Sequence, residues 1–201
     1  TAPPENGGLG FTFKWNMGWM NDFLSYMEKE PIHRKFHHNL LTFSLMYAFS
    51  ENYLLPISHD EVVHGKGSLL GKMPGDDWQQ FANLRLLYAM QWAQPGKKLL
   101  FMGCELATRI EWNHESTLDW SLHDADGHGG VRRWLADINR LYTDEPGLHR
   151  GDSDPGGIQW VEGADADQSV YAWLRKDPTG EGRPVLAVFN ATPMPRHNYR
   201  L

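Results

Sequence analysis

Cysteine is almost absent from this sequence, which has only Cys104 among its 201 residues. A chain with one cysteine holds no internal disulfide, and this excludes the small scaffolds that disulfides stabilise. A lone thiol also fits a reducing compartment, so we expect a cytoplasmic protein.

Positive charge and long apolar runs are also scarce. The 19 lysines and arginines are outnumbered by 25 aspartates and glutamates, and the formal net charge of -6 disfavours a nucleic-acid partner. The densest apolar run, residues 40–49, is too short to cross a bilayer and includes Thr42 and Ser44. We therefore expect neither a nucleic-acid nor a membrane partner.

Tryptophan, in contrast, is abundant, with nine residues. Sugar rings lie flat on aromatic faces, which suits a carbohydrate-binding protein, but large aromatic residues also fill cores. We expect about two-thirds of them to be buried packing residues, because aromatic side chains are so often buried.

The first 146 residues predict alternating strands and helices. A strand is expected over 9–15, and Trp19, Phe23 and Met27 mark a helix that must stop near Pro31. The later elements follow in chain order: a buried helix over 40–49, a strand over 52–57, a helix from the capping pair Asp76 and Gln79 to Pro95, a strand over 97–102, and a helix over 131–142.

This alternation indicates an α/β fold with a parallel sheet. Long polar loops follow the strands, over 58–75 and 103–130, and in a barrel of parallel strands such loops mark the working face. The character changes after a Pro- and Gly-rich stretch at 145–157, beyond which three strand-like segments begin near Ile158, Val170 and Val185. We expect one domain over 1–146 and the start of an all-β domain over 147–201.

The pair His59 and Asp60 stands where an apolar strand ends and a Gly-rich loop begins. Barrel enzymes place catalytic groups there, and a carboxylate beside an imidazole can bind hydroxyls or stabilise developing positive charge. In the alternative interpretation Asp60 merely caps a turn and the backbone satisfies His59.

A metal site is a further alternative for the same stretch. His59, Asp60, Glu61 and His64 are four potential ligands within six residues. The two histidines are five apart and flanked by proline and glycine, so no helical face presents both, as the zinc-protease motif requires. We expect no metal there.

Several stretches resemble bacterial glycogen branching enzymes of the α-amylase family, in the same order and spacing. They are GLGFTFKWNMGWMNDFL, SHDEVVHGKGSLL and EWNHESTLDW, together with MPGDDWQQFANLRLLYAMQWAQPGKKLLFMG and PMPRHNYR. The chain departs from the pattern at Cys104 and Thr108, where such enzymes often have asparagine and glutamine.

The resemblance implies a fold and a chemistry. The fold would be the last strands and helices of a (β/α)8 TIM barrel, followed by part of an all-β C-terminal domain. The family cleaves an α-1,4-glucan such as amylose or glycogen by a retaining mechanism and transfers the chain to a 6-hydroxyl, without metal or organic cofactor. Asp60 matches the carboxylate that holds sugar hydroxyls in the transition state and His59 its partner, while Trp15, Glu61 and Trp112 are the implied substrate-binding residues.

The resemblance also implies that two catalytic residues and the other barrel strands are not among these 201 residues. The nucleophile and the acid/base residue belong to earlier strands, so we expect them upstream of Thr1 and the isolated chain to be inactive. The remainder of such an enzyme would be needed to close the barrel. Two alternatives stay open, a family hydrolase of maltooligosaccharides and a non-catalytic glucan-binding remnant with Trp15 and Trp112 as its platform.

Overall fold

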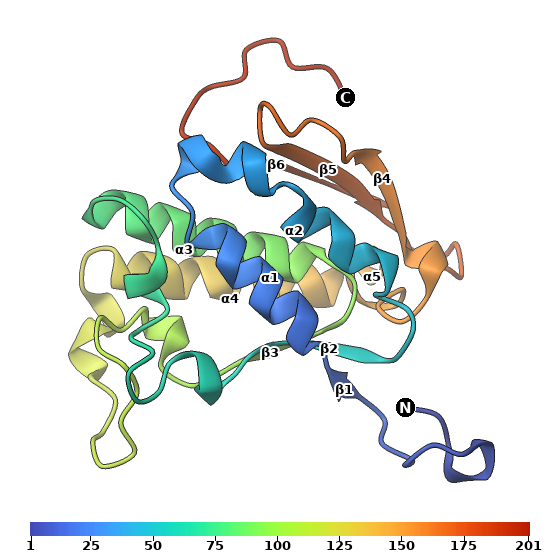
Figure 1. The fold of residues 1–201 in the computed structure, drawn as a ribbon, viewed down its shortest axis with the longest axis horizontal. Helices are drawn as coiled ribbons and strands as arrows, with labels where there is room; N and C mark the ends of the chain where they lie inside the picture. Colours follow the sequence, from blue (N-terminus) through green and yellow to red (C-terminus); the bar gives the residue numbers. More distant parts are fainter.

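A computed structural model describes residues 1–201 and contains two three-stranded sheets (Figure 1). The first sheet is parallel, in the order β1 (Lys14–Trp15), β2 (Tyr53–Ile57) and β3 (Lys97–Leu100). The second is antiparallel, in the order β4 (Ile158–Glu162), β5 (Val170–Arg175) and β6 (Val185–Asn190). The α-helices are α1 (Met17–Met27), α2 (Asn39–Thr42), α3 (Asp77–Ala93), α4 (His128–Asp144) and α5 (Pro146–His149).

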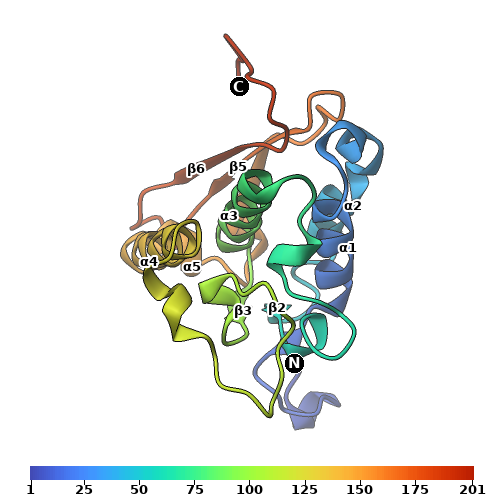
Figure 2. The ribbon, with the colours of Figure 1, turned by 90° about the vertical axis from the view of Figure 1, so that its left-hand side faces the viewer.

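The helices connect the parallel strands and separate the two sheets. Helix α1 follows β1 and α3 follows β2, as crossovers between parallel strands require. Figure 2 shows α1, α3 and α4 side by side, with β2 and β3 below them and β5 and β6 above. The parallel α/β arrangement and the three later β strands predicted from the sequence are confirmed. None of the helices is long and apolar enough to cross a membrane.

Helix α3 forms as its sequence predicts. The Gln79 amide donates to the Asp76 carboxylate at 2.9 Å, and the Asp76 amide donates back to the Gln79 side chain at 2.8 Å, which completes a capping box. Its inner face, Phe81, Leu84, Tyr88 and Trp92, is buried, and Phe81 and Trp92 contact His128 and Asn139 of α4. At the far end Gly96 has φ +116°, and a Cβ there would lie 3.0 Å from Leu55, so the turn into β3 needs glycine.

Two predicted elements are wrong in extent. Of the strand expected over 9–15 only Lys14–Trp15 pairs with β2, and Phe11 and Phe13 are exposed. The helix expected over 40–49 is a four-residue helix followed by the 3-10 turn Phe43–Met46, with Phe43 and Met46 exposed. An apolar run without a polar face does not specify which side is buried, and no side chain caps this short helix.

One hydrophobic core joins both sheets. It contains 29 buried residues, among them side chains of α1, α3 and α4 and also Tyr171, Trp173 and Phe189 of the second sheet. The indole Nε1 of Trp173 donates to the Ala93 carbonyl at the end of α3, at 2.9 Å. The second sheet therefore packs directly on the helical layer, and the predicted domain boundary after residue 146 stays a prediction.

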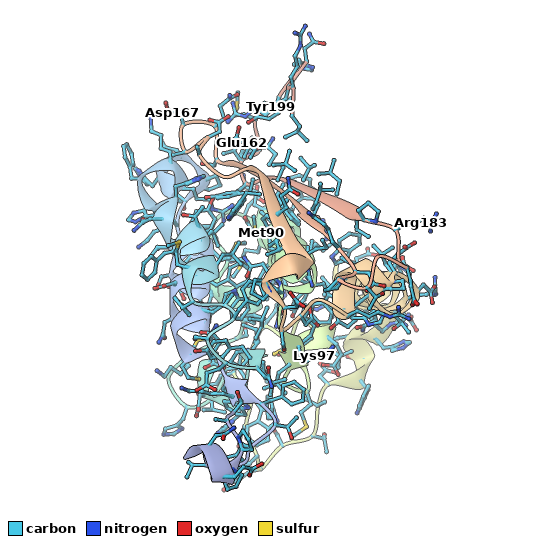
Figure 3. The ribbon with its side chains drawn as sticks, turned by 90° about the vertical axis from the view of Figure 1, so that its right-hand side faces the viewer. Met90, Lys97, Glu162, Asp167, Arg183 and Tyr199 are labelled. Carbon is cyan, nitrogen blue, oxygen red and sulfur yellow. The ribbon has the colours of Figure 1, made fainter.

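A buried ionic network, which we call the junction, ties this layer to the second sheet; Figure 3 labels one of its members, Lys97. The Asp152 carboxylate accepts hydrogen bonds from Arg175 at 2.9 Å and from Tyr142, and Lys97 lies 3.2 Å away. Burial opposes ionisation of Asp152, but the nearby cations Lys98 and Arg175 outweigh it and hold its pKa below the usual value.

Candidate active site

The loops that follow β2 and β3 leave the parallel sheet at the same edge. Ile57 is level with Leu100, and the Phe101 amide donates to the Ile57 carbonyl at 2.8 Å. Figure 1 shows both loops gathered at the left end, where β2 and β3 end. This is the carboxyl edge at which the sequence places its chemistry.

A tight 3-10 turn, His59–Glu61, opens the loop after β2. Ser58 caps it: its hydroxyl accepts from the Asp60 amide at 3.2 Å, while the Ser58 amide donates to the Glu61 carboxylate at 2.5 Å. The interpretation in which Asp60 caps the turn is wrong, because Ser58 and Glu61 already do so. The Asp60 carboxylate is thereby left free of the turn.

His59 and Asp60 point out of this turn as a pair. The His59 Nε2 lies 3.2 Å from the Asp60 carboxylate, and the two side chains keep 51% and 58% of their surface exposed. No other side chain hydrogen bonds to the Asp60 carboxylate, so most of its lone pairs can accept from a ligand. Such an open carboxylate beside an imidazole suits the binding of sugar hydroxyls.

Glu61 has a different environment from Asp60. It is buried, and its carboxylate accepts a hydrogen bond from the Ser58 amide. In this arrangement Glu61 fixes the turn that presents Asp60. Its predicted contact with substrate stays a prediction.

Trp112 joins the site through an aromatic residue that the sequence reasoning missed. Phe101, the first residue after β3, has its ring centroid 6.0 Å from that of His59 and 5.2 Å from that of Trp112, the latter edge to face. Edge-to-face packing fixes the orientation of both rings. Phe101 lies within the strand predicted over 97–102, and its contact with His59 depends on the register of β2 and β3, so no local sequence signal marked it.

Trp15 does not join the group formed by His59, Asp60, Phe101 and Trp112. The register places it opposite Leu54, three residues before the end of β2, and its side chain makes neither an aromatic contact nor a hydrogen bond with His59 or Asp60. It is partly exposed, so a role in binding needs a ligand that extends along the sheet.

The two loops are joined to one another above the sheet edge. The Trp112 amide donates to the Val62 carbonyl at 2.8 Å, and Val63 and Trp112 form an isolated parallel bridge. The second loop helps to enclose a cavity of about 240 Å³, which is lined by apolar residues, by polar residues that include Glu111 and Asp119, and by the buried Cys104 and His128. Burial raises the pKa of the Cys104 thiol to about 12, which keeps it protonated. His, Cys, Asp and Glu side chains nowhere form a group of three or more placed to hold a metal ion.

Comparison with known proteins adds to this geometry. Over all 201 residues the chain is 60% identical to the 1,4-alpha-glucan branching enzyme GlgB of Albidiferax ferrireducens and 58% identical to that of Pseudomonas putida. The chain is homologous to 1,4-alpha-glucan branching enzymes along its whole length. It spans about a third of the length of these curated relatives, 32% of the first and 27% of the second. Residues 160–201 match the family of the alpha amylase C-terminal all-beta domain.

Solved structures support the fold at lower identity. The apo pullulanase of Paenibacillus barengoltzii matches 89% of this chain over 31% of its own, with a TM-score of 0.67 and 16% identity. The protein Ttha1563 of Thermus thermophilus matches 97% of this chain over 40% of its own, with a TM-score of 0.65 and 19% identity. Like the branching enzymes, these proteins are much longer than the chain.

Proposed function

We propose that this chain forms part of an enzyme that cleaves an α-1,4-glucan and transfers the cleaved chain to a 6-hydroxyl, which creates an α-1,6 branch in glycogen biosynthesis. The observation that carries the proposal is the exposed pair His59 and Asp60 at the carboxyl edge of the parallel sheet. It is supported by 60% identity to a named branching enzyme over the whole chain.

In this proposal Asp60 accepts hydrogen bonds from hydroxyls of the sugar whose glycosidic bond is cleaved. The ring flattens toward an oxocarbenium ion in the transition state, and bonds that strengthen as it does so lower the barrier. His59 orients the carboxylate, and the rings of Phe101 and Trp112 support His59 from the side of β3. No metal or organic cofactor takes part in this chemistry.

We propose that the parallel strands are the last three of a (β/α)8 barrel, with residues 1–146 belonging to the barrel and 147–201 to the all-β domain. Strands β1 and β3 are the edges of a three-stranded sheet and would pair with further strands in a closed barrel. The nucleophile and the acid/base carboxylate would come from those strands. Residues 1–201 alone would then not catalyse branching, and their open edges favour aggregation. A cytoplasmic location is part of the same proposal.

A segment exchange tests the function. The exchange enzyme is the Albidiferax ferrireducens protein in which the present chain replaces the matched segment, 32% of its length. We expect it to lower the iodine staining of amylose and to produce α-1,6 linkages visible by proton NMR, and we expect Asp60→Asn to slow both strongly. The unexchanged relative is the positive control.

The other outcomes separate the alternatives. Reducing ends without new branches, from a folded exchange enzyme, would support a hydrolase of maltooligosaccharides. Binding of amylose without either product would support a glucan-binding segment. Full branching by the Asp60→Asn protein would show that the assigned role of Asp60 is wrong.

A further inference from the structure

The carboxylate of Glu111 is held by the backbone of the other loop. Its Oε2 atom accepts hydrogen bonds from the amides of Gly65, at 2.8 Å, and Gly67, at 3.2 Å. Glu111 stands in the loop after β3 and next to Trp112, whereas the two glycines stand in the loop after Asp60. We call this contact the Glu111 clamp.

The backbone around the two glycines is shaped for an anion. His64, Gly65 and Gly67 have positive φ values of 28°, 80° and 73°. Lys66, between the two glycines, does not have a positive φ, and this alternation over residues 65–67 turns the amides toward one point and makes a concavity that binds negative charge. A Cβ at either glycine would meet no atom within 4 Å, so the left-handed conformation, and not lack of space, is what favours glycine.

Few contacts other than the clamp hold residues 64–67 in place. Glu111 lines the 240 Å³ cavity, and most of residues 108–119 are exposed, so apart from Trp112, which packs against the core, little packing holds this part of the loop. Residues 64–67 are all exposed and make no core contact. Other contacts also restrain the two loops: the Trp112–Val62 hydrogen bond, the Val63–Trp112 bridge, the Lys66 amide bond to the Val63 carbonyl at 3.1 Å, the Lys72 ammonium bond to the Lys66 carbonyl at 2.7 Å and the Arg109–Asp77 ion pair. Among these contacts, the clamp alone reaches the amides of Gly65 and Gly67.

We propose that Glu111 is a positioning residue that sets the ratio of glucan transfer to hydrolysis. The inference rests on the proposed function. By fixing residues 64–67, which follow Asp60 by four to seven residues, the clamp would keep rigid the wall of the site that we take to face the second glucan chain. A rigid wall orients the acceptor hydroxyl and reduces the access of water.

The step whose outcome this wall would influence is a single displacement at the anomeric carbon of the glucan held on the enzyme. The bond between the anomeric carbon and the enzyme carboxylate breaks, and a bond from that carbon to the incoming oxygen forms. The proton of the incoming hydroxyl passes to the carboxylate that earlier acted as the acid. Water and a glucan 6-hydroxyl compete for this step on equal chemical terms, so positioning decides between them.

The test compares Glu111→Ala with Glu115→Ala in the exchange enzyme. Glu115 lies in the same loop, is largely exposed and contacts only His114, at 3.9 Å, and its own neighbours, which makes it a matched control. We expect Glu111→Ala to lower the number of branches per new reducing end by about tenfold, a moderate loss of positioning. Glu115→Ala should leave that ratio unchanged. Glu111→Gln keeps an acceptor oxygen without the charge, so it should fall between the two.

A second readout does not depend on activity. Lys66 is exposed within the clamped loop, so trypsin should cut after Lys66 several times faster in Glu111→Ala than in Glu115→Ala. An unchanged ratio, or an equal loss of cleavage and transfer, would overturn the inference even if the loop is loosened. A failure of the unsubstituted exchange enzyme to form branches would instead overturn the proposed function, and this inference with it.

Discussion

Two aspartates in different regions of this molecule, Asp152 and Asp60, have carboxylates that are used differently. At the junction Asp152 is 2% exposed and accepts from Arg175, Tyr142 and the Gly96 amide. At the carboxyl edge of the parallel sheet Asp60 is 58% exposed and has only His59 beside its carboxylate.

The difference separates structural from available carboxylates. A carboxylate has about four acceptor sites, and at the junction protein donors fill most of them, so nothing remains for a ligand. At the carboxyl edge the sites of Asp60 stay open, while the buried neighbour Glu61 carries the structural bond. Burial and hydrogen bonding thus predict opposite consequences for substitution of the two aspartates.

The largest expected effect on stability is that of Asp152→Ala. It would leave Arg175, which is fully buried, without its counterion, and breaking a buried pair in this way costs about 3–5 kcal/mol. Urea unfolding of the exchange enzyme, followed by tryptophan fluorescence, measures the loss. The exposed Asp144, substituted in the same way, should change stability by less than about 0.5 kcal/mol. Equal effects of the two would show that the junction is not a unit of stability.

Asp60→Asn should reverse the pattern expected for Asp152→Ala, with a large loss of activity and little change in stability. We expect the branching rate of the exchange enzyme to fall about 100- to 1000-fold, the usual cost of one preorganised transition-state contact. Stability should change by less than about 0.5 kcal/mol, because the carboxylate supports no other part of the fold. A loss of activity that tracks a loss of folding, seen by circular dichroism, would contradict this.

A smaller effect is expected from the titration of Lys98, which should make the free energy of unfolding depend on pH. The Lys98 ammonium donates to the carbonyls of Gln94 and Gly96, and Asp152, Arg175, Lys97 and the Tyr142 ring surround it. Burial lowers its pKa to about 7, below the 10.5 of an ordinary lysine. Between these values the unfolded chain binds one more proton than the folded one, so stability rises with pH.

The expected rise from pH 7 to pH 9 is about 1–2 kcal/mol, reduced from the full linkage value because Lys98 keeps some exposed surface. The interval stops at pH 9 because the raised pKa of Cys104 lowers stability above it. Urea unfolding at several pH values should show the rise in the unsubstituted exchange enzyme and in Lys66→Met, but not in Lys98→Met. A rise that persists in Lys98→Met would assign it to another group.

What the sequence predicted, and what it did not, follows from how local each signal is. Helix α3 was predictable because its cap, its inner face and its proline stop lie within twenty residues. The pair His59 and Asp60 was predictable because strand ends are visible in the sequence. The Glu111 clamp was not, because backbone amides 44 and 46 residues away carry no sequence signal for their partner. The same holds for Phe101, whose contact with His59 depends on the register of two strands.

The smallest expected effect distinguishes two tryptophans that the resemblance treats alike. Trp112 packs on Phe101 at the carboxyl edge, whereas the register leaves Trp15 opposite Leu54. An aromatic contact of this kind contributes about 0.5–1.5 kcal/mol, so Trp112→Ala should lower kcat/KM for amylose by about two- to tenfold in the exchange enzyme. Trp15→Ala should lower it less than about twofold. A larger effect at Trp15 would mean that substrate runs along the parallel sheet from β2 toward β1, and the binding surface would then have to be redrawn across both strands.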